Sequence, residues 1–173
     1  MSSETPRNLV WKHIRAIGTC MMVTHNGDLI RARPMRGIVR PEQNAIWFFT
    51  EAEANMDVEL SRDNRVCLTF SDVKNNTYVS VSGCIEIIRD HDSRADLWND
   101  EADSYFEKGP RDPRAILLKF GPETGQYWDA PSSAIVIAIK FIEAKIMGER
   151  PDMGEAGHAQ FASPVGTKAP AAR

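Results

Sequence analysis

The sequence predicts a mainly β domain with a few added helices, arranged as an antiparallel barrel or sandwich. Short apolar or alternating segments recur along the chain and are separated by turn-forming residues, a pattern typical of antiparallel strands. These segments do not alternate with long helices, and the sequence has no glycine-rich phosphate loop of the GxGxxG or GxxxxGK[ST] form. Both observations disfavour a doubly wound nucleotide-binding fold.

Residues 5–17 predict a helix at the start of the domain. Thr5 is placed to cap it, Pro6 occupies the first helical position, and apolar residues recur at helical spacing up to Gly18. The next segment, residues 20–39, contains the turn signal Asn26-Gly27 between an apolar run and an alternating run, which indicates a β-hairpin.

A third strand is expected after Pro41, where turn-like residues precede AIWFFT at 45–50. On this interpretation RARPM at 31–35 and WFFT at 47–50 lie on neighbouring strands.

The middle of the chain predicts two helices and two further strands. Residues 52–62 and 91–107 have helical composition, the second with Asp92 or Ser93 as a candidate cap. RVCLTFSD at 65–72 and TYVSVSGCIEII at 77–88 are the strands. Gly83 marks a bulge or a close approach of the backbone.

The last third predicts a rigid loop, strands and a tail. The loop KGPRDPR leads to a strand at 116–122, then to an aromatic turn at 127–133 and a β-branched run at 134–147 that predicts a further strand or two. From Arg150 onward Gly, Ala and Pro dominate. We therefore expect one domain at 1–149 and a flexible tail at 150–173.

Composition narrows the classes of function. With 173 residues, 42% hydrophobic and 26% charged, the chain has the make-up of an ordinary globular domain. Its N-terminus MSSETPRN has no secretory pattern, and no apolar run approaches the roughly 18 residues of a membrane span. We expect a cytoplasmic protein without a membrane partner. The net charge of −3 argues against nucleic acid as a partner.

Few side chains show the spacing of a catalytic or metal site. The four histidines, His13, His25, His91 and His158, have no metal-ligand spacing, so we expect no metal. The three cysteines, Cys20, Cys67 and Cys84, lie far apart in apolar segments, which favours buried reduced thiols. The sequence has no G-x-S-x-G elbow, and Asp90-His91-Asp92 is interpreted as a helix-capping group rather than an acid/base cluster.

Two segments combine a cation with flat apolar side chains. Arg33 supplies a fixed positive charge and Thr50 a hydroxyl at a strand end, while Trp47, Phe48 and Phe49 supply aromatic surface. This combination suits a planar heterocycle that carries a phosphate. The alternative is that the aromatic residues belong to the core and that Arg31, Arg33, Arg36 and Arg40 form the solvated face of a strand.

These segments also resemble a known family. The quoted segments are RARPM, WFFT, NRVCLTFSD, YVSVSG, the Leu97-Trp98 pair, GPRDPR, ILLKF and YWD. In this order, from about Asn8 to Ile142, the sequence resembles the pyridoxamine 5'-phosphate oxidase-like FMN-binding split-barrel family, and most closely its general stress protein branch. The resemblance implies a split barrel of about six antiparallel strands that forms a homodimer and binds FMN at the subunit interface.

The resemblance also implies which residues contact FMN. It places Arg33, Pro34 and Met35 beside the isoalloxazine, and Phe48, Phe49 and Thr50 along the ring, the ribityl chain and the start of the phosphate site. Trp98 and Trp128 either approach the flavin from the facing subunit or pack the dimer interface.

The sequence departs from the family at Ala54 and Met56, where relatives usually have a serine and a lysine. One hypothesis places Met56 beside the FMN phosphate, which then lacks a cation. The alternative is that Met56 faces inward from its helix and packs on the barrel.

Three functions follow from these observations. The first is an FMN-dependent oxidoreductase related to pyridoxamine 5'-phosphate oxidases, with the redox chemistry carried by the cofactor. The second is a non-catalytic flavin-binding stress-response protein. The third is a scaffold that has lost FMN.

Overall fold

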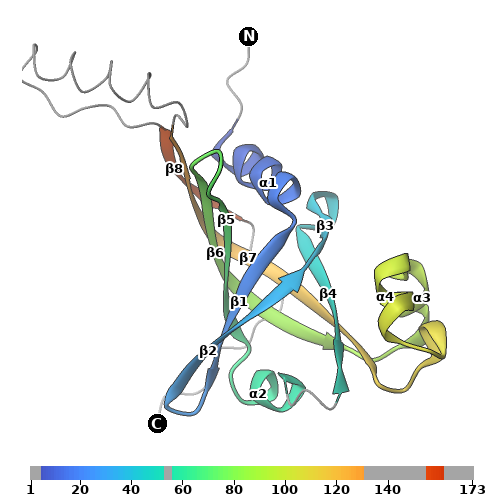
Figure 1. Ribbon diagram of the computed structural model, residues 1–173. Coiled ribbons are helices and arrows are strands. Elements are labelled where there is room, and N and C mark those ends of the chain that lie inside the picture. Colours follow the sequence, from blue (N-terminus) through green and yellow to red (C-terminus); the bar gives the residue numbers. More distant parts are fainter. Residues whose placement is uncertain (1–4, 53–55, 131–154, 162–173) are drawn as a thin grey trace, which may run out of the picture.

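An antiparallel sheet curls into a split barrel, with helices at its two ends and at one side (Figure 1). The computed structural model describes residues 5–52, 56–130 and 155–161. The strands are β1 (Thr19–Asn26), β2 (Leu29–Arg36), β3 (Ile38–Arg40), β4 (Ala45–Glu51), β5 (Arg65–Asp72), β6 (Thr77–Ile88), β7 (Ala115–Asp129) and β8 (Glu155–Gln160). The hydrogen-bonded order is β2-β1-β5-β6-β7-β4-β3, and β8 pairs with β7. The predicted fold class is confirmed, with eight described strands instead of about six.

The helix α1 (Pro6–Ile17) agrees with the prediction at both ends. The Thr5 side chain accepts a hydrogen bond from the Asn8 N–H at 3.3 Å, and Gly18 ends the helix with a φ of +77°. Val10, Trp11 and Ile14 share the buried face. This face packs on β5, β6, β7 and β8, so α1 closes one end of the barrel.

The β1–β2 hairpin is also confirmed. Asn26 pairs with Leu29, and Gly27 takes the positive φ that a two-residue loop requires.

The expected pairing of RARPM with WFFT is wrong. Strand β2 pairs with β1, whereas β4 pairs with β3 and β7. The chain changes direction at Gly37, where a Cβ atom would lie 2.5 Å from the Ile46 side chain. After the short strand β3, a 3-10 turn at Pro41–Gln43 leads into β4. Gly37 therefore stands between β2 and β3, at a place where a side chain would collide with Ile46.

The longest strands, β6 and β7, pair along nearly their whole length. Their register shifts between Ser82 and Gly83, opposite Pro122, which confirms the predicted irregularity at Gly83. Strand β7 continues through Tyr127-Trp128-Asp129, so the expected aromatic turn at 127–133 is wrong for these three residues. Because β6 and β8 both pair with this part of β7, it stays extended.

Each of the two later predicted helices differs from the prediction in its bounds. The helix α2 spans Met56–Arg62, and Ala54 lies outside the described residues. The segment at 91–107 forms two helices, α3 (His91–Leu97) and α4 (Asp100–Tyr105). Asp90, rather than Asp92 or Ser93, caps α3 by accepting a hydrogen bond from the Ser93 N–H at 2.8 Å. The capping interpretation of the Asp90 cluster is therefore confirmed.

The segment expected to be a flexible tail contains a strand. Residues 155–160 form β8, and Phe161 is 5% exposed with its ring edge-on to Trp11 at 5.5 Å. The expectation of a flexible tail is wrong for these residues, because pairing with β7 and burial against α1 offset their low apolar content. The predicted strand at 134–147 lies outside the described residues.

The cysteines are free thiols, as predicted. Cys20 is buried in the core, and burial raises its pKa to about 12. Cys67 and Cys84 are half-buried rather than buried, because they sit on the outer side of the sheet.

Candidate functional site

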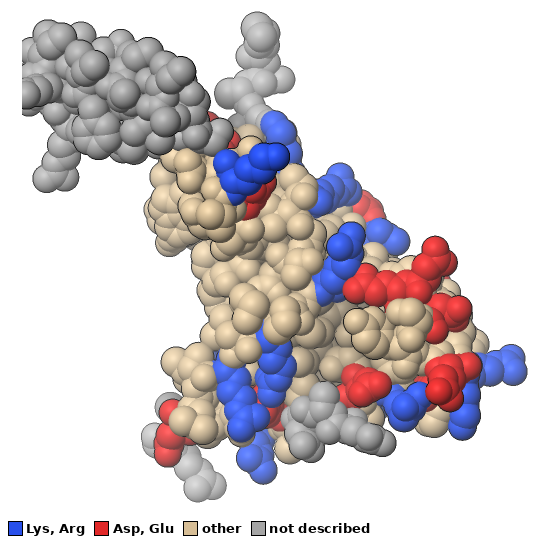
Figure 2. Space-filling view, in the orientation of Figure 1, with Lys and Arg blue, Asp and Glu red and all other residues tan. Residues whose placement is uncertain are grey.

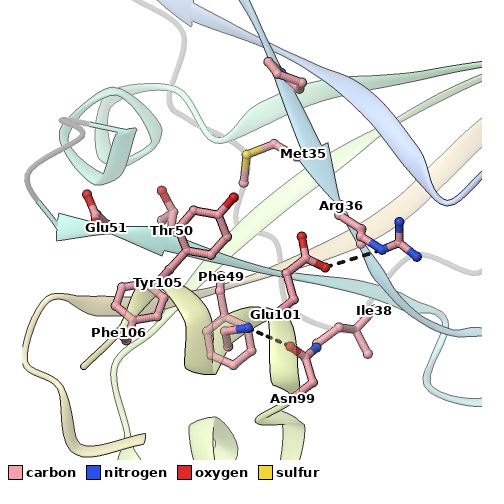
Figure 3. A pocket seen from close by; sticks show the side chains of 13 residues that line it. Met35, Arg36, Ile38, Phe49, Thr50, Glu51, Asn99, Glu101, Tyr105 and Phe106 are labelled. Atoms are coloured by element: carbon pink, nitrogen blue, oxygen red, sulfur yellow. Dashed lines mark hydrogen bonds and ion pairs between the residues drawn. The ribbon is translucent and has the colours of Figure 1, made fainter. Parts of the chain in front are cut away.

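A pocket of about 240 Å³ opens where the end of β2 approaches β4, with α4 as its outer wall (Figure 3). Its apolar lining consists of Pro34, Met35, Gly37, Ile38, Phe49, Ala102 and Phe106. Its polar lining consists of Arg36, Thr50, Glu51, Asn99, Glu101 and Tyr105. A concave site with apolar surface and convergent polar groups can hold a small molecule.

The position of α4 depends on a break in the predicted helix. Trp98 ends α3 in an extended conformation, and Asn99 then caps α4 by accepting a hydrogen bond from the Ala102 N–H at 2.9 Å. The Trp98 ring packs edge-on against Phe49 at 5.2 Å and lies 5.8 Å from the Phe106 ring. These aromatic contacts attach α4 to β4, so the pocket wall rests on the strand that forms its floor.

One ion pair joins β2 to α4 at the pocket. Arg36 Nε lies 3.4 Å from Glu101 Oε2, and both side chains are at least half exposed (Figure 3). An exposed pair of this kind contributes about 0–1 kcal/mol. A ligand can therefore displace it at little cost.

A second ion-pair network lies just before the pocket on β2. Arg33 donates a hydrogen bond from Nη2 to Glu59 Oε1 at 2.9 Å, and its Nη1 forms an ion pair with Glu59 Oε2 at 2.9 Å. Arg31 approaches Glu59 at 3.2 Å, and the Thr24 hydroxyl donates to it at 3.4 Å. Glu59 is 5% exposed, and the hydrogen bonds from Arg33 hold its pKa below the usual range. This network attaches β2 to α2.

Comparison with known families identifies the chain. The family model described as pyridoxamine 5'-phosphate oxidase like matches residues 6–152. The chain belongs to this family. No curated protein shows a significant match.

Solved structures of the same fold include several general stress proteins. A general stress FMN/FAD binding protein from Xanthomonas citri is 28% identical with a TM-score of 0.64, over 71% of this chain and 87% of that chain. A general stress family protein from Xanthomonas campestris is 28% identical with a TM-score of 0.66, over 77% and 93%. A protein related to general stress protein 26 from Clostridium acetobutylicum is 24% identical with a TM-score of 0.67, over 74% and 91%.

In this family member, four of the expected site residues meet in the pocket. Pro34 and Met35 come from β2, and Phe49 and Thr50 come from β4. The two strands are not neighbours in the sheet, but the barrel's curvature brings their ends together. Thr50 lines the pocket and is only 8% exposed.

The other expected site residues do not line the pocket. Phe48 and Met56 are almost fully buried in the core, Trp98 packs behind Phe49, and Arg33 is held by Glu59. Trp128 is 43% exposed at the opposite end of β7, where it pairs with Tyr78 and Ala156. Within one chain, Trp128 therefore has no route to the pocket.

Sequence reasoning missed the residues from α4 and the role of Glu59. Glu101 and Tyr105 reach the pocket only because the helix breaks at Asn99, and the signal for that break was the capping potential of Asn99 itself. No motif distinguishes Glu59 from the other carboxylates of residues 51–59. Met56, Glu59 and Leu60 follow the helical spacing i, i+3 and i+4, which places Glu59 on the buried face of α2.

In the residues that the structure describes, the His, Cys, Asp and Glu side chains form no group of three or more that could hold a metal ion. None of the described helices has the length and apolar character required to cross a lipid bilayer.

Proposed function

We propose that the protein binds FMN with its isoalloxazine in the pocket between β2 and β4, and acts as an FMN-dependent oxidoreductase. The observation that carries this proposal is the meeting of Pro34 and Met35 with Phe49 and Thr50 in one pocket. Membership of the pyridoxamine 5'-phosphate oxidase like family supports it. The similarity to the general stress FMN/FAD binding protein from Xanthomonas citri supports a flavin as the ligand.

The pocket fits the ring of a flavin better than the whole cofactor. Met35, Phe49 and Phe106 offer the apolar surface that a flat ring system requires. The volume of about 240 Å³ is below the roughly 300–1,000 Å³ of sites that enclose a whole ligand. The ribityl phosphate therefore extends beyond the pocket, where a second subunit would cover it.

A bound flavin would supply the redox chemistry. The residues of this chain would hold and orient the ring and exclude water from one of its faces. The Arg36–Glu101 pair lies at the edge of the pocket, where a small-molecule substrate would meet the ring.

We also propose a homodimer, based on the outer face of the barrel. By strand alternation, Met21, Val23, Cys67, Thr69 and Ser80 point outward from the central parts of β1, β5 and β6 and are uncharged. The charged residues Arg65 and Glu86 lie on the same side, nearer the strand ends. Such a face is typical of a surface that is buried in a two-fold interface. Light scattering should give twice the 19.4 kDa of one chain. A Met21→Glu variant should be monomeric, and a monomeric wild-type protein would contradict the proposal.

We place the protein in the cytoplasm because its cysteines are free thiols. Thiols of this kind persist in reducing compartments.

A non-catalytic flavin-binding stress-response protein is the second candidate. Among the described lining residues there is no histidine or cysteine, the side chains that most often move protons or attack substrates near neutral pH. This observation favours a role in binding flavin without turnover.

Two measurements test these proposals. The absorbance spectrum of protein purified without added cofactor should show flavin bands, or FMN should titrate to one per chain. A colourless protein that does not bind added FMN would contradict flavin binding. It would favour the third hypothesis, a scaffold that has lost FMN. Steady-state reduction of a dye acceptor by NADH or NADPH should then occur if the protein is an oxidoreductase. Stoichiometric binding without turnover would favour the second candidate.

A further inference from the structure

Glu59 is a buried carboxylate that forms ion pairs with two arginines. It lies on the inward face of α2 with Met56 and Leu60, and its two oxygens face Arg33, Arg31 and Thr24. The two N–O distances of 2.9 Å to Arg33 define a bidentate contact, which is the geometry in which a guanidinium also binds a phosphate. Glu59 therefore occupies an anion site built by this chain.

This anion site adjoins the pocket. Arg33 directly precedes Pro34 and Met35 in β2, and Thr50 at the end of β4 is followed closely along the chain by α2. Figure 1 shows α2 between the β1–β2 hairpin and the end of β4. The positive charges that would meet a phosphate leaving the pocket on this side are those of Arg31 and Arg33. Both pair with Glu59, whose single negative charge offsets one of the two.

We propose that Glu59 determines ligand specificity by holding Arg31 and Arg33 in place of the ligand's phosphate, so that the protein binds FMN no more tightly than riboflavin. The proposal rests on the flavin site proposed above. A phosphate that approached Arg33 would have to displace a carboxylate that is 5% exposed and leave it without a partner. If Glu59 stayed in place, the phosphate would meet its negative charge beside the two guanidinium groups that already pair with it. In both cases the phosphate adds no affinity, so the affinity for FMN comes from its isoalloxazine.

The first test compares ligands on the wild-type protein. Titrations of FMN and of riboflavin, followed by flavin fluorescence, should give dissociation constants within about threefold of each other. A wild-type protein that binds FMN more than tenfold more tightly would overturn the proposal. If neither flavin binds, the proposed function fails and the arm with inorganic phosphate described below still tests Glu59.

The second test removes the internal anion. A Glu59→Gln variant keeps the shape and leaves Arg31 and Arg33 without a charged partner, so FMN should bind about tenfold to a hundredfold more tightly while riboflavin is unchanged. The matched control is Asp57→Asn, because Asp57 is a carboxylate of the same helix that pairs with Arg89 at 2.8 Å. It should leave both affinities unchanged. If Glu59→Gln changed the affinities for FMN and riboflavin equally, Glu59 would have a structural role only.

The third test uses inorganic phosphate as the probe, without flavin. The melting temperature of Glu59→Gln should rise with phosphate concentration at constant ionic strength, and that of the wild-type and Asp57→Asn proteins should not. Should Glu59→Gln fail to fold, the ratio of FMN to riboflavin affinity in the wild-type protein decides the question alone.

Discussion

Replacing Met56 by lysine separates two interpretations of the position where the sequence departs from its relatives. Met56 is 1% exposed and belongs to the main core cluster. A lysine there must either carry its charge into the core or become neutral. With an ordinary pKa of about 10.4, a lysine that is kept neutral at pH 7 costs about 1.36 kcal/mol per pH unit over about 3.4 units, or about 4.6 kcal/mol. Small domains have only about 5–15 kcal/mol of stability.

The structure therefore predicts that Met56→Lys lowers the free energy of unfolding at pH 7 by about 4 kcal/mol or more, with no gain in FMN affinity. Because burial lowers the folded-state pKa of this lysine below its unfolded value, the loss should shrink as pH rises from 7 toward 10. Urea denaturation at several pH values measures both effects.

Two controls accompany this experiment. Val58→Lys introduces the same charge on the same helix at a side chain that is 48% exposed, and should change stability by less than about 0.5 kcal/mol. Met56→Leu conserves volume and should cost less than about 1.5 kcal/mol. A Met56→Lys protein that is as stable as Val58→Lys and binds FMN, but not riboflavin, more tightly would refute the reasoning and place Met56 beside the phosphate.

Three further variants test the fold around the site. Phe161→Ala should cost about 3 kcal/mol and lower the melting temperature by several degrees, because Phe161 is buried. Gln160→Ala, at the exposed neighbour, should leave the melting temperature unchanged. If Phe161→Ala melts at the same temperature as wild type, the tail is dispensable. Asn99→Ala removes the cap of α4 and should cost about 1 kcal/mol in chemical denaturation. Hydrogen bonds from Arg114 lower the pKa of Asp112 to about 2, so Asp112→Asn should be less stable than wild type at pH 7, and the difference should narrow between about pH 4 and 2; a constant difference would exclude this cause.

Local patterns were sufficient to predict the first helix, the strands β1, β2, β4, β5 and β6, and the first part of β7. The Thr5 cap, the Asn26-Gly27 turn and the alternation in β5 and β6 each depend on residues close together in the chain. The irregularity at Gly83 could also be predicted, because a glycine inside a long strand usually marks a bulge or a close contact.

Pairings between distant segments could not be predicted from these patterns. The WFFT strand pairs with β7, about 70 residues later along the chain, and nothing in its own sequence indicates that partner. The same limit applies to β8, whose composition resembles a flexible segment and whose order depends on β7 and Trp11.

The candidate site was predicted where backbone position decides it and missed where side-chain partners decide it. Pro34, Met35, Phe49 and Thr50 reach the pocket because strand ends place them there. Arg33 has the right position on β2, but its guanidinium is taken by Glu59 from a helix 26 residues later. A cation's partner is a property of the tertiary structure, so a sequence motif alone leaves it open.

The location of a bound flavin ring tests the central claim most directly. We expect a crystal structure of the protein grown with saturating riboflavin to show the isoalloxazine in the pocket between the ends of β2 and β4, in contact with Met35 and Phe49. Riboflavin is the suitable probe because its ring is that of FMN and it has no phosphate to compete with Glu59. Density for the ring elsewhere on the molecule, or a pocket without flavin at saturation, would contradict the proposed site.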